Sequence, residues 1–192
     1  MIEIRDEALW DHDAREELLD RAFGLSRFEK TSERLREGRV PAIALSAFRH
    51  DGDGRETLVA SVRLWNAETA DGRPVLLLGP LAVDESCRGF GIGARLMRTA
   101  LNRAAVAGHS AVVLVGDAPY YGRFGFSSAL TLGLDLPGPV ERERFLALEL
   151  AEGALDGAMG CLCPTGLLGD ASVAASDEDF DALFVRPWPP AR

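Results

Sequence analysis

Hydrophobic residues follow two distinct patterns in the middle of the chain. Residues 75–83 form an apolar run, which predicts a β-strand. From Ile92 to Ala104 the apolar residues return every three or four positions, which is the period of a helix with one buried face. Gly108 then provides a helix stop, and residues 111–115 are a short run rich in β-branched residues. The pattern therefore predicts a strand, a loop, a helix and a second strand in succession.

Weaker patterns on both sides of this unit predict further elements. A first helix is expected to begin after Asp11 or Asp13 and to end near Phe23, and a second is expected over residues 29–37, ending at Gly38. The remaining expected strands are residues 2–5, 43–48, 58–65, 130–136 and 145–150.

The C-terminal residues differ from the rest in composition. Residues 170–192 are acidic and then proline-rich, which is typical of an extension without its own core. A chain of 192 residues can bury roughly 70% of its unfolded surface in one core. We therefore expect one domain over residues 1–169 and a C-terminal extension over residues 170–192.

Gly79 and Pro80 interrupt the strand predicted for residues 75–83. Proline has no N–H to donate to a sheet, so it is normally absent from central strands. A β-bulge at this pair accommodates it, whereas the alternative is an edge strand or a shifted strand boundary.

A glycine-rich loop lies between the predicted strand and helix. Gly89, Gly91 and Gly93 occupy alternate positions just before and within the start of the helix. Because glycine leaves the backbone uncovered, several N–H groups and the positive end of the helix can bind one anion there. The loop predicts a site for a phosphate-bearing cofactor.

One interpretation of this loop is a dinucleotide-binding fingerprint. Gly89, Gly91 and Ala94 match its spacing, and Asp117 stands where a ribose-binding acid is needed. However, residues 84–88 separate the first glycine from the strand, and no second βαβ half is recognisable. A nucleotide-binding oxidoreductase is therefore the alternative hypothesis.

A second pair of motifs fits better. Arg88, Gly91 and Gly93 match Arg-x-x-Gly-x-Gly, and Tyr121-Gly-Arg-Phe-Gly125-Phe126 follows one helix and one strand later. Together these segments resemble the acyl-CoA-binding motif and the Tyr-x-x-x-Gly-Phe element of the GNAT superfamily of N-acetyltransferases. The resemblance is strong over residues 75–126 and looser over residues 2–150, and residues 116–119 replace a longer helical lead-in.

This resemblance implies both a fold and a cofactor. The fold is of the α/β (α+β) class, with a central mixed, mostly antiparallel sheet flanked by helices, whose fourth and fifth strands splay apart. The cofactor is acetyl-CoA, used as a co-substrate, and no metal is expected. The implied cofactor-binding residues are Leu81, Ala82, Val83, Arg88, Gly89, Phe90, Gly91, Ile92, Gly93 and Ala94.

The implied reaction is transfer of the acetyl group to a primary amine by direct attack within a ternary complex. Main-chain N–H groups near residues 81–83 would stabilise the oxyanion. Tyr121 is the candidate acid for the departing thiolate, because its spacing to Gly125 matches the motif, although Tyr120 offers the same hydroxyl. A GNAT-like module that binds acyl-CoA without turnover is a further alternative.

The net charge of the chain limits the classes of binding partner that we expect. The chain has 21 basic and 30 acidic side chains and a formal charge of −9, which argues against nucleic acid. The acidic balance suits a cationic acceptor, drawn by carboxylates on the first helix such as Glu16, Glu17 or Asp20, or serves only solubility. The expected partner is a small-molecule or peptide amine, and a homodimer is an open possibility.

The three cysteines and the N-terminal residues indicate the cellular compartment that we expect for the protein. Cys87, Cys161 and Cys163 are an odd number without disulfide-like spacing, and recognisable metal-ligand partners are lacking. The first residues are charged and no apolar run approaches about 18 residues. We expect a cytoplasmic protein with no membrane partner and with Cys161 and Cys163 on strands.

Overall fold

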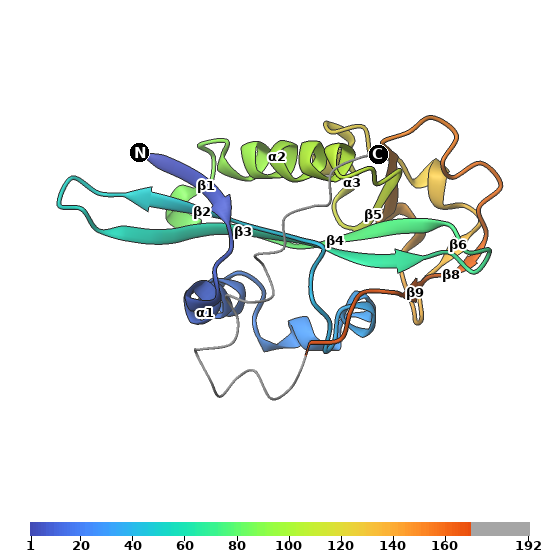
Figure 1. Ribbon diagram of the computed structural model, residues 1–192, viewed down its shortest axis with the longest axis horizontal. Coiled ribbons are helices and arrows are strands. Elements are labelled where there is room, and N and C mark those ends of the chain that lie inside the picture. Colours follow the sequence, from blue (N-terminus) through green and yellow to red (C-terminus); the bar gives the residue numbers. More distant parts are fainter. Residues whose placement is uncertain (170–192) are drawn as a thin grey trace, which may run out of the picture.

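A twisted β-sheet separates two layers of helices in the computed structural model, which describes residues 1–169 (Figure 1). Neighbouring strands are antiparallel except β4 and β5, which are parallel. The strand order is β1 (Ile2–Asp6), β2 (Ile43–His50), β3 (Glu56–Glu68), β4 (Pro74–Val83), β5 (Ala111–Val115) and β7 (Phe145–Glu149), with β9 (Cys163–Pro164) also paired to β3. The predicted mixed, mostly antiparallel sheet is confirmed, and the extension expected over residues 170–192 lies outside the described residues.

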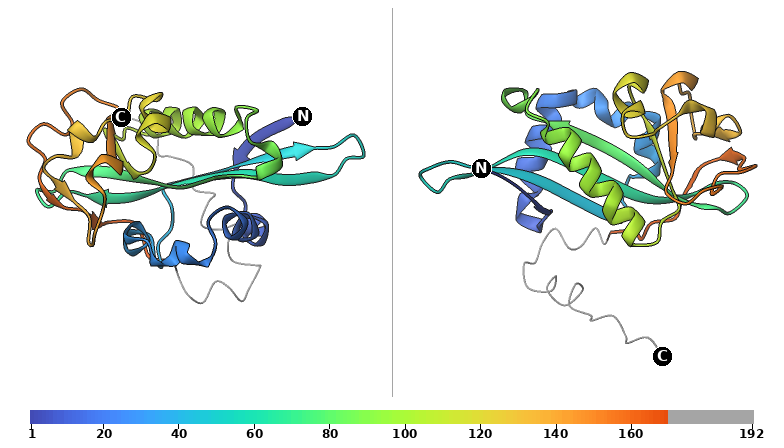
Figure 2. Two further views of the ribbon diagram at one scale, coloured as in Figure 1. Left: turned by 180° about the vertical axis from the view of Figure 1, so that it is seen from behind. Right: turned by 90° about the horizontal axis from the view of Figure 1, so that it is seen from above.

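The helices cover opposite faces of this sheet. Helix α2 (Ile92–Val106) crosses one face, and α1 (His12–Phe23) lies on the other (Figures 1 and 2). The apolar stripe of α2, which includes Leu96 and Ala100, is completely buried, whereas α1 buries Leu18 against the opposite face. The predicted helical periodicity of both segments therefore matches their packing.

Two of the predicted elements are wrong. Residues 29–37 form no α-helix: the 3-10 helices η2 (Leu25–Glu29) and η3 (Thr31–Leu35) are separated by Lys30 in an extended conformation. Tertiary contacts override the helical propensity, because Thr31 Oγ1 donates to Pro139 O at 2.8 Å and Leu35 alone is buried in these two helices. Residues 130–136 contain only the two-residue strand β6 (Leu134–Asp135).

Strand β6 belongs to a small second sheet. It pairs in parallel with β8 (Gly160–Cys161), close to β9, which begins at Cys163. The expected strand positions of the two C-terminal cysteines are confirmed, and all three cysteines of the chain are free thiols. No helix within residues 1–169 has the length and apolar character needed to cross a bilayer.

Strand β4 carries the predicted bulge. Its register with β3 passes from Leu78 opposite Leu64 to Leu81 opposite Val62, so Gly79 and Pro80 together face one residue of β3. The bulge places Pro80, which lacks an N–H, where the ladder is already interrupted.

The predicted divergence of β4 and β5 is also present. These strands pair only at Leu76 with Val112 and at Leu77 with Val113, although β4 continues to Val83. Beyond Leu77, the β4 backbone groups that point toward β5 receive no partner from that strand. The sheet therefore opens next to the loop that leads into α2.

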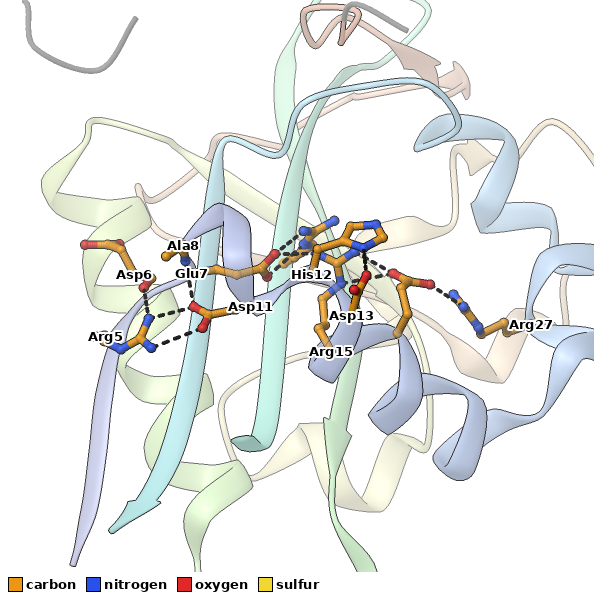
Figure 3. Close-up of polar contacts among 11 residues, drawn as sticks. Arg5, Asp6, Glu7, Ala8, Asp11, His12, Asp13, Arg15 and Arg27 are labelled. Carbon is orange, nitrogen blue, oxygen red and sulfur yellow. Dashed lines mark hydrogen bonds and ion pairs between the residues drawn. The ribbon is translucent and has the colours of Figure 1, made fainter. Parts of the chain in front are cut away.

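Buried ion pairs fasten α1 to the sheet (Figure 3). Arg15 is 3% exposed and donates to Glu7, which also accepts a 3.0 Å hydrogen bond from Arg63 Nε on β3. Arg15 also contacts Glu16, at 2.5 Å. Burial raises the pKa of Glu7 to about 7, and the charge of Arg15 opposes this shift. The network links α1 and β3 through charged side chains that are largely buried from solvent.

Replacement of Arg15 tests how much this network contributes to the free energy of unfolding. We expect Arg15→Met to lower the free energy of unfolding by about 3–5 kcal/mol, because Glu7 would keep only Arg63 as a charged partner. Arg21→Met is the matched control on α1, since the Arg21 side chain is 55% exposed and its ion pairs should contribute less than about 1 kcal/mol. Urea unfolding measures both, and equal losses would contradict the structural role of the buried pairs.

Candidate active site

The loop between β4 and α2 is built around turns that expose its backbone. Asp84 Oδ1 accepts from Ser86 N at 3.0 Å and starts the short helix η4 (Glu85–Cys87). Gly89 and Gly91 then adopt φ values of 83° and 76°, which side-chain-bearing residues rarely adopt. Gly91 is the N-cap of α2, and the first N–H groups of this 15-residue helix have no partner within the helix. They form a suitable site for an anion.

Gly93 allows a close approach of three segments. A Cβ atom at this position would lie 3.0 Å from Val83 Cγ2 and 3.1 Å from the hydroxyl of Tyr120. The absence of a side chain therefore brings together the end of β4, the start of α2 and Tyr120. Sequence spacing alone did not predict that the Tyr120 hydroxyl lies beside this glycine.

The two tyrosines belong to the short helix α3 (Ala118–Gly122), and their rings meet edge to face with centroids 5.0 Å apart. Tyr121 lies against Gly116, where no side chain could fit beside its ring, and 6.0 Å from the Phe126 ring. Burial raises the pKa of Tyr121 to about 12, and the positive charge of Arg144 opposes this shift. Tyr121 therefore keeps its proton at neutral pH and can act as a hydrogen-bond donor.

The acid suggested for a dinucleotide site has another role. Asp117 Oδ2 accepts from Tyr120 N at 3.0 Å and caps α3. Apart from β4 and β5, the main sheet is antiparallel, whereas a dinucleotide-binding fold requires a parallel doubly wound sheet. The structure does not support the oxidoreductase hypothesis.

The predicted cofactor residues fall into two adjoining groups. Residues 81–83 form the end of β4, and residues 88–94 form the loop and the start of α2. Within the second group, Arg88 and Phe90 are exposed and Ile92 is buried. Among residues 1–169 no three His, Cys, Asp or Glu side chains converge as a metal site.

Further arginines lie near the loop, and two of them on α2, Arg95 and Arg98, were not predicted as site residues. Arg123 lies 4.6 Å from the centroid of the Tyr120 ring, and Arg98 lies 5.4 Å from that of Phe124. Arg95 borders a cavity of about 340 Å³ beside the loop. The helical spacing of Arg95 and Arg98 could have revealed them, because residues three apart share a helix face.

This cavity also receives side chains from the first two strands. Its lining residues are Ile2, Arg49, Ser86, Cys87, Phe90, Gly91, Ile92 and Arg95. Arg49 comes from β2, far from the loop in sequence, so only the fold brings it close. Both arginines place positive charge near the loop of a protein whose formal charge is −9.

The carboxylates proposed to attract a cationic amine are already paired. Glu16 contacts Arg15 and Arg27, and Asp20 Oδ1 lies 2.9 Å from Arg27 Nε. Glu17 Oε2 lies 3.7 Å from Arg21. These arginines offset much of the attraction that α1 would exert on a positive charge.

Comparisons with known proteins agree with this geometry. The sequence model of a family described as an acetyltransferase (GNAT) domain matches residues 48–128. The uncharacterized N-acetyltransferase YhbS of Escherichia coli (strain K12) is 31% identical over 159 residues, covering 82% of this chain and 92% of YhbS. The uncharacterized N-acetyltransferase YjhQ from the same strain is 32% identical over 130 residues, covering 66% of this chain and 71% of YjhQ.

Solved structures share the fold. The crystal structure of Escherichia coli YhbS in complex with CoA matches with a TM-score of 0.72 and 30% identity, over 85% of this chain and 89% of that one. A GNAT family acetyltransferase from Brucella melitensis in complex with acetyl-CoA matches in fold, with a TM-score of 0.58 and 23% identity over 90% of this chain and 98% of that one. The chain belongs to the GNAT family of N-acetyltransferases.

Proposed function

We propose that this acyltransferase moves an acetyl group from acetyl-CoA to a primary amine by direct attack within a ternary complex. The observation that carries the proposal is the opening between β4 and β5 directly beside the glycine loop of α2. Family membership supports the reaction class, and the YhbS and Brucella structures contain CoA and acetyl-CoA.

The cofactor would be held mainly by backbone groups. N–H groups of Gly91, Ile92 and Gly93 bind the pyrophosphate, assisted by the positive end of α2. Arg88 is an exposed cation on the same loop. The pantetheine arm enters the opening, where the β4 backbone lacks β5 as a partner. The thioester would then lie along residues 81–83.

The transfer step forms one bond and breaks another. The neutral amine attacks the carbonyl carbon, a C–N bond forms, the C–S bond breaks, and CoA leaves as a thiolate, while the proton that the nitrogen loses in becoming an amide passes to solvent. A main-chain N–H among residues 81–83 stabilises the oxyanion. Tyr121 donates a hydrogen bond to the thiolate. Because the pKa of Tyr121, about 12, lies above the ordinary thiol value of about 8.5, the phenol stabilises the leaving group without completing the proton transfer.

Substitution of Gly91 tests the cofactor loop. We expect Gly91→Asp to weaken acetyl-CoA binding at least 10-fold, about 1.4 kcal/mol, because a carboxylate would face the pyrophosphate. Isothermal titration calorimetry measures the change. Gly91→Asn introduces the same bulk without the charge and should lose less.

A control separates this effect from backbone strain. Gly72, in the turn between β3 and β4, has a φ of 83° and, like Gly91, open space around a would-be Cβ. Gly72→Asp should therefore strain the backbone similarly and leave the affinity unchanged. Unaltered acetyl-CoA affinity in folded Gly91→Asp would contradict the proposed pyrophosphate site.

Release of free CoA from acetyl-CoA with a panel of primary amines tests the reaction. We expect at least one amine to accelerate release, and Tyr121→Phe to lower kcat by up to about 10²–10³-fold, because the thiolate loses its hydrogen-bond donor, while acetyl-CoA affinity stays nearly unchanged. Tyr120→Phe is the matched control and should have little effect. Absence of amine-dependent release would contradict acetyl transfer, and a larger loss in Tyr120→Phe would assign the acid to the hydroxyl beside Gly93 instead.

A further inference from the structure

Three basic side chains gather on the face of the sheet opposite α2. Lys30 lies between η2 and η3, Arg36 directly follows η3, and Arg144 immediately precedes β7. The η2 and η3 helices share this face with α1 (Figure 1). Lys30 and Arg36 come from the segment between α1 and β2 and Arg144 from the segment before β7, so only the fold brings Arg144 to the other two.

Arg36 is directed at the bulge of β4. It is 7% exposed, and its Nη1 lies 3.8 Å from the point that a Cβ atom of Gly79 would occupy. Its Nη2 donates to Glu33, whereas its Nε has no partner within residues 1–169. The Gly79 carbonyl already accepts from Trp65 Nε1 at 2.6 Å. A buried N–H group without an acceptor destabilises the fold, so this guanidinium is well suited to bind an anionic ligand.

Lys30 and Arg144 extend the positive charge. Within the described part of the chain no carboxylate oxygen lies within 4.0 Å of Lys30 Nζ, which sits 4.8 Å from the Phe23 ring centroid. Burial and the charges of Arg36 and Arg144 lower the pKa of Lys30. Arg144 has Glu141 as a partner at a distance of 3.8 Å. Arg36 and Arg144 are thus close enough to Lys30 for their charges to act on it.

The position of Arg144 connects this cluster to the reaction. Its carbonyl accepts from Gly116 N at 2.9 Å, which fixes it at the end of β5, next to the glycine covered by the Tyr121 ring. The charge of Arg144 in turn opposes the rise in the pKa of Tyr121 that burial causes. The basic residues therefore reach from the bulge of β4, where Arg36 lies, to the end of β5 beside Tyr121, where the backbone of Arg144 is held.

Hydrogen bonds to residues 137–139 hold the short helix that precedes Arg36. Thr31 and Arg34 of η3 donate to Pro139 O and Pro137 O at 2.8 and 2.6 Å. These contacts hold η3, and hence Arg36, before any ligand arrives. A ligand therefore meets an ordered site and loses less free energy in organising it.

We propose that the amine acceptor carries an anionic group, a carboxylate or a phosphate, which Lys30, Arg36 and Arg144 bind while the amine reaches the thioester. This inference rests on the proposed acetyl transfer. It reverses the expectation of a cationic acceptor drawn from the net charge, because Lys30 has no carboxylate partner among residues 1–169 and Arg36 keeps an unpaired Nε, whereas the α1 carboxylates are paired.

Four amines of similar size distinguish the ligand classes: β-alanine, O-phosphoethanolamine, β-alaninamide and 1,3-diaminopropane. In assays of CoA release we expect kcat/KM for β-alanine or O-phosphoethanolamine to exceed that for the neutral amide at least 10-fold. The better of the two anions identifies the group. The amide has the less basic amine, so its larger neutral fraction works against the expected ranking.

Substitutions of the basic residues test whether they cause the preference for anionic amines. Lys30→Gln changes a partly exposed side chain and should lower kcat/KM for the preferred anionic amine at least 10-fold while changing that for β-alaninamide less than 2-fold. Because Arg144 also acts on Tyr121, Arg144→Gln is judged by the ratio of kcat/KM for the anionic amine to that for β-alaninamide, which should fall at least 10-fold. Arg55→Gln, an equal charge change at the exposed β2–β3 turn, should alter neither. Faster turnover of the neutral or dicationic amine, or equal losses for all amines, would overturn the inference and leave acetyl transfer intact.

A binding measurement separates the two proposals if no amine is turned over. Calorimetric titration of the CoA-saturated protein with β-alanine and with O-phosphoethanolamine should show binding of one of them that Lys30→Gln weakens at least 10-fold. Binding without CoA release would contradict acetyl transfer alone. Absence of binding by both anions would overturn the acceptor site.

Discussion

The incomplete pairing of β4 with β5 is the constraint on which the rest of the structure depends. β3 holds β4 on both sides of the bulge, whereas β5 pairs with it over only two residues. The Gly79–Pro80 bulge lies just beyond that short ladder, so the strand changes course where its outer edge becomes free. On one face the opening meets the N-terminus of α2 and Tyr120, and on the other it meets Arg36. A cofactor and an acceptor can therefore approach the same few residues from opposite faces.

Electrostatics in this protein is decided locally. The formal charge of −9 describes the whole chain, yet Arg49 and Arg95 border the cavity beside the glycine loop, and Arg36 lies at the bulge with its charge acting on nearby Lys30. Most acidic side chains of α1 form ion pairs with arginines, and one of these arginines, Arg15, belongs to the buried network that anchors the helix. Since burial strengthens charge interactions at short range, these local arrangements determine which ligands bind, while the net charge acts mainly at long range.

The sequence predicted the elements whose information is local. The segment from β4 through α2 to β5 has strong periodicity and its own turn chemistry, so its strands, its helix, its bulge and its exposed loop were all predictable. Residues 29–37 were predicted incorrectly because contacts with residues 137–139 determine their conformation. The meeting of Lys30, Arg36 and Arg144 and the placement of the Tyr120 hydroxyl beside Gly93 depend on tertiary packing, which leaves no mark on local spacing.

The central claim is that acetyl-CoA occupies the opening between β4 and β5 with its pyrophosphate on the loop of α2. Hydrogen–deuterium exchange of the full chain with and without saturating acetyl-CoA tests it most directly. The account predicts slower exchange of the backbone amides of residues 81–83 and 89–93, with little change in the turn at residues 51–54. Protection confined to other segments, or none at residues 81–83 and 89–93 under saturation, would contradict it.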